Sequence, residues 1–141
     1  MTEVIDIDKP EGKIFTEKSF QVGTFFGGPL VAGYMMATNY KQIGQSDKVK
    51  ITWIITVTFT IALFAFLFAI PGDIKIPNQI IPILYTLGAI QIFKKQQGIK
   101  VAKFLEEGGQ KYPWYSILMI ILMGLIFTVL PIVLIFIYDW N

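Results

Sequence analysis

Four long runs without charge constrain this chain more than any other feature. No Asp, Glu, Lys or Arg occurs at residues 20–40, 51–70, 78–93 or 114–138. A helix rises ~1.5 Å per residue, so about 20 apolar residues cross a hydrocarbon core of about 30 Å. Charged residues make up 16% of the chain, against about 25% in a typical soluble domain. The pattern excludes a soluble globular domain and predicts an all-α integral membrane bundle of four transmembrane helices.

The domain organisation follows from these runs. We expect a polar flexible tail over residues 1–19, with Thr16 as a helix N-cap, and a single membrane domain over residues 20–141. The tail lacks the basic and then apolar order of a signal peptide. Because the third run is short, it needs the residues before it to cross the core. The predicted spans are residues 20–40, 51–70, 76–93 and 114–138.

The lysines predict the orientation. Eight of the twelve lie in the loops at 41–50 and 94–113, which the positive-inside rule places in the cytoplasm. We therefore expect a multi-pass protein of a cell membrane, the inner membrane of a bacterium. Four spans leave four Lys outside. If residues 20–40 were re-entrant, the tail would stay inside and the split would be eleven to one. We expect four spans, because the first run is long enough to cross.

All three Trp lie at borders of the runs, at Trp53, Trp114 and Trp140. Trp favours the headgroup region because its ring is apolar and its N–H needs a partner. We therefore expect these residues to be interface anchors, with burial in a core as the alternative.

The loop before the last run contains an amphipathic segment. From Ile99 to Glu107, helical spacing separates an apolar side from a lysine-bearing side, and Gly108 and Gly109 end it. Such a helix lies in the membrane interface and is attracted to anionic lipids; docking of a cytoplasmic partner is the alternative. We expect four lysines to contact lipid headgroups: Lys94, Lys95, Lys100 and Lys103.

The first run carries the small residues that favour close helix packing in lipid. Proline removes a backbone hydrogen bond, so we expect a kink near residues 27–29. Our hypothesis is that Gly27 and Gly28 admit a crossing helix and that Pro29 frees the Phe25 carbonyl for a Thr or Tyr. The crossing helix belongs either to the same chain, which we favour, or to a second copy. The packing candidates are Gly23, Gly27, Gly28, Pro29 and Gly33.

Polar groups inside the runs are few. Thr52, Thr56 and Thr60 form a stripe at helical spacing, which either lines a polar path or, as we favour, bonds back to the preceding turn. A second set could form a small network between helices: Tyr34, Tyr85, Thr86 and Gln91.

Absent residue types limit the chemistry. The chain has no Cys, His or Arg, which excludes thiol catalysis, a histidine base and bidentate phosphate clamps. No ionisable residue lies within a run, so a proton relay at depth cannot be built. We expect no enzyme activity, no cofactor or metal, and no nucleic-acid partner.

One stretch resembles a known family. The segments Gly28-Pro29-Leu30 and Ala32-Gly33-Tyr34, then Asn39-Tyr40-Lys41 and Gly44, resemble uncharacterised small bacterial integral membrane proteins with a GGPL-x-AGY…NYK-x-x-G first segment. The resemblance is strongest over residues 24–44. It implies a membrane location and topology and carries over no catalytic residue.

Two functional classes follow. The first is a structural or accessory membrane protein that binds another membrane component. The alternative is an uncoupled channel or transporter subunit for small solutes or ions, formed by homo-oligomers. The predicted partners are the lipid bilayer, including anionic lipids, and either a second copy or another membrane protein.

Overall fold

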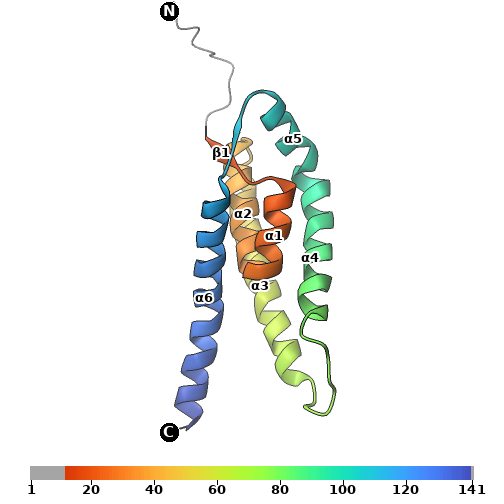
Figure 1. Ribbon diagram of the computed structural model, residues 1–141, viewed down its shortest axis with the longest axis vertical. Helices are drawn as coiled ribbons and strands as arrows, with labels where there is room; N and C mark the ends of the chain where they lie inside the picture. Colours follow the sequence, from red (N-terminus) through yellow and green to blue (C-terminus); the bar gives the residue numbers. More distant parts are fainter. Residues whose placement is uncertain (1–11, 141) are drawn as a thin grey trace, which may run out of the picture.

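The computed structural model describes residues 12–140, and its architecture is all-α (Figure 1). Three long helical segments run roughly side by side, and a short helical pair lies among them near one end. In chain order the elements are β1 (Lys13–Ile14), α1 (Glu17–Gly27), α2 (Pro29–Gln42), α3 (Asp47–Ala69), α4 (Ile80–Phe93), a π-helix (Lys94–Gly98), α5 (Ile99–Glu106), β2 (Gln110–Lys111) and α6 (Trp114–Trp140).

The prediction of one kinked span over residues 20–40 is wrong, because the chain turns back at Gly28. Gly28 has φ +87°, a left-handed conformation that glycine adopts at no steric cost. Its N–H closes α1 on the Thr24 carbonyl at 2.9 Å. Pro29 then occupies the first turn of α2, where the missing N–H costs nothing. Helices α1 and α2 therefore form an antiparallel hairpin, which we call the α1–α2 hairpin.

Two of the four predicted spans are single helices of sufficient length. Within residues 12–140, α3 and α6 are long and apolar enough to cross a membrane, and only 6% and 11% of their most apolar windows are buried. The predicted start of the third span at residue 76 is wrong, since α4 begins at Ile80, whereas α4 ends at Phe93 as predicted. Residues 71–79 form turns, since Pro77 disfavours a helical Ile76. Beyond Phe93 the helix continues through the π-helix into α5.

The predicted amphipathic helix before the last run is present as α5. Val101 and Phe104 are buried, whereas Lys100 and Lys103 are exposed, and the helix ends just before Gly108. It continues from α4 and bends away at the end of the bundle (Figure 1).

The core lies around the α1–α2 hairpin. Phe20 of α1 stacks on Phe93 of α4 with ring centroids 4.7 Å apart, and both are fully buried. Met35 and Val31 of α2 are buried in the same core. The hairpin stops well short of the far ends of α3 and α6, and α4 extends a short way past it (Figure 1).

The predicted flexible tail is wrong over residues 12–19. Ile14 and Phe15 are buried, and β1 pairs in parallel with β2. Thr16 is the N-cap of α1, as predicted, and accepts a bond from the Ser19 N–H at 3.2 Å. The rest of the predicted tail, residues 1–11, lies outside the described residues.

Candidate functional site

A buried amide pair joins three elements beside the hairpin. Asn39 Oδ1 accepts the Phe15 N–H at 2.8 Å, and its Nδ2 donates to the Phe15 carbonyl at 2.9 Å and to Gln97 Oε1 at 3.2 Å. Gln97 Nε2 donates to the Met36 carbonyl at 2.8 Å. Both side chains are fully buried. Because buried amides without partners are costly, this network fixes the start of α1, the end of α2 and the π-helix together.

Sequence reasoning missed this pair and predicted a different network. Gln91 is exposed, the Thr86 hydroxyl is buried without a partner, and Tyr34 is exposed. The signal that could have found the pair is Asn39, the one carboxamide in the last turns of the first run. Gln97 gave no such signal. It is the buried residue of the π-helix, and a helical pattern with a period of 3.6 residues does not predict a π-helix.

The freed Phe25 carbonyl has the partner that the hypothesis expected. Tyr85 of α4 donates its hydroxyl to that carbonyl at 3.3 Å. The cause is the helix break, since α1 ends at Gly27 and Pro29 has no N–H to offer. The bond ties the turn of the hairpin to α4.

Some of the glycine candidates are needed for close contacts, and one is needed for its backbone conformation. A side chain at Gly23 would meet Met35 within the hairpin, and one at Gly33 would meet Thr56 of α3. A side chain at Gly27 would meet Val31, again within the hairpin. Gly28 has open space around it, so the proposed close crossing there is wrong and its role is the positive φ.

Gly124 of α6 is a contact that sequence reasoning missed. A side chain there would meet Val31 and lie 3.1 Å from the Gly27 carbonyl. The hairpin turn therefore packs on α6 through a glycine from each side, within one chain.

The threonine hydroxyls of α3 donate hydrogen bonds to the preceding turn of the helix, the alternative that we favoured. Thr52, Thr56 and Thr60 donate to the carbonyls four residues earlier at 2.7, 2.7 and 2.8 Å. Their hydroxyl protons are thereby used within the helix, and the stripe presents methyl groups and oxygens with no free donor.

An apolar groove of about 680 Å³ lies between α3 and α4, with the α1–α2 hairpin as its floor. We call it the α3–α4 groove. Ligand sites commonly have volumes of about 300–1,000 Å³. Its walls are aliphatic and aromatic: Ile55, Phe59 and Phe66 come from α3, and Ile81, Leu84 and Ile92 from α4.

One end of the α3–α4 groove is polar. Lys48, Tyr40 and Gln96 line it there, where α3 begins and α4 leads into the π-helix. Lys48 Nζ lies 5.6 Å from the centroid of the Tyr40 ring, a cation–π arrangement. Neither ion pair within residues 12–140 involves Lys48.

The four predicted headgroup lysines lie at the same end of the molecule. Lys94 is 3.5 Å from Glu17, and Lys103 is 3.9 Å from Glu107. Lys95 and Lys100 are also exposed: all four belong to the π-helix and α5.

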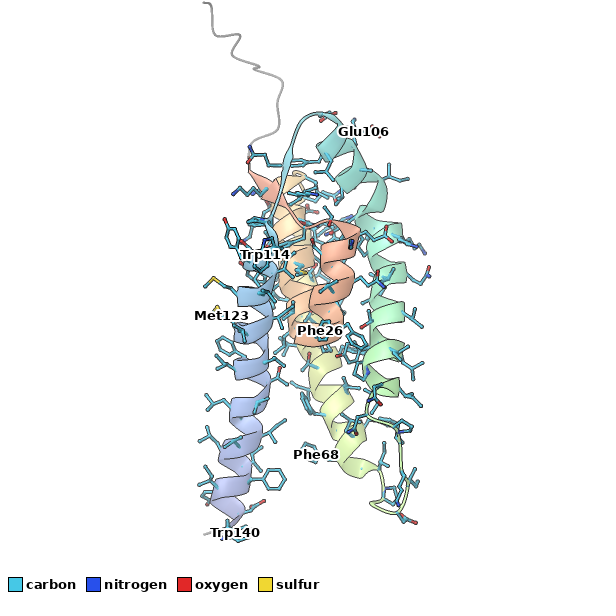
Figure 2. The ribbon with its side chains drawn as sticks, viewed as in Figure 1. Phe26, Phe68, Glu106, Trp114, Met123 and Trp140 are labelled. Atoms are coloured by element: carbon cyan, nitrogen blue, oxygen red, sulfur yellow. The ribbon has the colours of Figure 1, made fainter. Side chains whose placement is uncertain are left out.

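The predicted anchors Trp114 and Trp140 lie at opposite ends of α6 (Figure 2). Their exposed fractions are 71% and 92%. Trp53 lies in the second turn of α3, edge-to-face with Tyr34. None of the three is buried, so burial in a core, the alternative, does not apply.

No family model, curated protein or solved structure matches this chain. The resemblance to a family of small membrane proteins stays a prediction. Residues 12–140 contain no cluster of acidic side chains that could hold a metal ion.

Proposed function

We propose that this chain is a multi-pass membrane protein that acts by binding another membrane component in the α3–α4 groove, without catalysis. The observation that carries the proposal is the groove itself, an apolar cavity walled by helices that are apolar on their outer faces too.

Exposed apolar side chains support the membrane location. Along α6, Leu122, Phe127 and Phe136 are 60%, 66% and 65% exposed, and the outer faces of α3 and α4 are similar. Soluble monomers rarely expose apolar patches beyond a few hundred Å². Helices buried inside a soluble protein would hide these residues, so a bilayer is the environment that fits them.

We propose three spans and a re-entrant hairpin. The spans are α3, α6 and α4, and the π-helix extends α4 so that Lys94 and Lys95 lie on the lysine-bearing side. From Ile80 to Gly98 the two elements measure about 27 Å at ~1.5 Å per residue. Re-entrant backbone is tolerated at depth where protein covers it. This topology puts eleven of the twelve Lys on one side and Lys75 on the other. The loops at 41–50 and 94–113 are then cytoplasmic.

Cysteine labelling tests the topology, because the chain has no native Cys. In intact cells we expect Asp73→Cys and Asp139→Cys to react with an impermeant maleimide. Lys13→Cys and Gln110→Cys should react only after lysis. Labelling of Lys13→Cys in intact cells would restore four spans.

Photo-crosslinking in cells tests the binding. A benzoylphenylalanine at Phe59 faces the α3–α4 groove, and the same residue at Phe127 on α6 is the matched control outside it. We expect an adduct of defined mass at position 59 that is absent at 127. Identical adducts at both positions would refute the proposal. Solute flux through liposomes containing the purified chain would favour the channel alternative instead.

A further inference from the structure

We infer that the α3–α4 groove binds an anionic phospholipid, with its phosphate at Lys48 and an acyl chain along the apolar walls. This inference rests on the proposed function and names the membrane component.

The charge arrangement points to an amphiphile of this polarity. Among residues 12–140, Lys48 is the one charged side chain that lines the groove, and it lies at the end shared with the lysine-bearing loops. Lys48 is half-buried over Tyr40, which holds the ammonium at the groove mouth. Tyr40 and Gln96 add polar groups beside it. A phosphate with glycerol hydroxyls meets these donors, whereas a choline headgroup adds a cation beside Lys48.

The length of the groove suits an acyl chain. From Ile51 to Phe66 the wall of α3 extends about 22 Å at ~1.5 Å per residue. Half of a hydrocarbon core is about 15 Å thick, so the groove accommodates a chain of one leaflet.

Two variants change the polar end and the apolar part of the groove separately. Lys48→Gln removes the cation, with Lys50→Gln on the same helix as its control outside the groove. Gly88→Phe fills the groove, because Gly88 lines it and a Cβ atom there would meet nothing within 4 Å. Leu87→Phe places the same ring on the neighbouring exposed position of α4, outside the groove.

Native mass spectrometry of the full chain in non-ionic detergent provides the measurement. The probes are palmitoyl-oleoyl phosphatidylglycerol and the phosphatidylcholine with the same chains. We expect one phosphatidylglycerol per chain, bound about tenfold tighter than phosphatidylcholine, equivalent to about 1.4 kcal/mol. Lys48→Gln should reduce phosphatidylglycerol to the phosphatidylcholine level. Gly88→Phe should weaken both lipids about tenfold, and both controls should bind like the parent.

Three results would overturn the inference. The first is equal affinity of the parent for both lipids, and the second is a preference that survives Lys48→Gln. The third is a dimer, or a complex with a membrane protein, that Gly88→Phe abolishes while lipid binding is unchanged. That third result would leave the proposed function standing with another occupant. Failure of the proposed function is separate: it is the identical adducts at positions 59 and 127.

Discussion

The two halves of the bundle hold their helices in different ways. In the half near α5, the α1–α2 hairpin packs against α3, α4 and α6, and the Asn39–Gln97 amides join its ends. In the other half α3, α4 and α6 continue past the hairpin without an element between them (Figure 1). In the proposed membrane location, lipid would remove the hydrophobic drive between helices, and packing and hydrogen bonds would hold them together. The hairpin packs against all three long helices and is therefore the element that joins them.

The largest expected effect compares one Phe from each half. Phe20 is fully buried against Phe93, whereas Phe68 is 66% exposed near the far end of α3 (Figure 2). Phe20→Ala should lower the free energy of unfolding by about 3–5 kcal/mol through lost contacts and a cavity. Phe68→Ala should change it by under about 0.5 kcal/mol, the range of surface substitutions. Unfolding in mixed detergent micelles measures both. Equal losses would mean that the far half is packed as well.

The second prediction tests the amide pair. Asn39→Leu leaves the Phe15 N–H and carbonyl buried without partners, and each orphaned group costs about 1–3 kcal/mol. We expect a loss of about 2–4 kcal/mol in the same assay. Gln91→Leu makes a similar change on the exposed face of α4 and should be near neutral. If Asn39→Leu were as stable as the parent, the network would not hold the hairpin.

The sequence predicted the features that depend on neighbouring residues, and it did not predict those that depend on contacts between distant residues. The apolar runs predicted helices at α3 and α6 because each helix is a local feature of uniform composition. The threonine bonds of α3 were predicted for the same reason, since donor and acceptor lie one turn apart. The Asn39–Gln97 bond joins residues 58 positions apart, and no local pattern specifies that pairing.

The first run shows how length misled the prediction. Its 21 uncharged residues suit a span, and the glycines and Pro29 were interpreted as a kink within one helix. A left-handed residue followed by a proline at a helix start is instead a reversal of direction. The lysine distribution favoured the re-entrant alternative, which leaves a split of eleven to one and which we propose. The α3–α4 groove was not predictable, because it exists only once the hairpin packs against both α3 and α4 and forms the floor between them.

The third prediction separates backbone conformation from close packing at Gly28. Gly28 has φ +87° and ψ −176°, a backbone region that is essentially restricted to glycine and costs other residues about 1–3 kcal/mol, and the space around it is open. Gly28→Ala and Gly28→Leu should therefore each destabilise by about 1–3 kcal/mol, with little difference between them. A much larger loss for Leu than for Ala, in the same unfolding assay, would mean that another helix does cross there.

The smallest expected effect concerns Thr56, at the middle of the α3 stripe beside Gly33. Its hydroxyl donates to the Thr52 carbonyl, a bond that adds little to a helix already bonded along its backbone. Thr56→Val keeps the shape and removes the hydroxyl, so the free energy of unfolding should change by under about 0.5 kcal/mol. Lipid binding in the α3–α4 groove should be unchanged, because the hydroxyl has no donor left for a ligand. A polar path along α3 would instead need that oxygen. Reconstituted vesicles in which the parent passes a small solute and Thr56→Val does not would therefore contradict this account of the stripe.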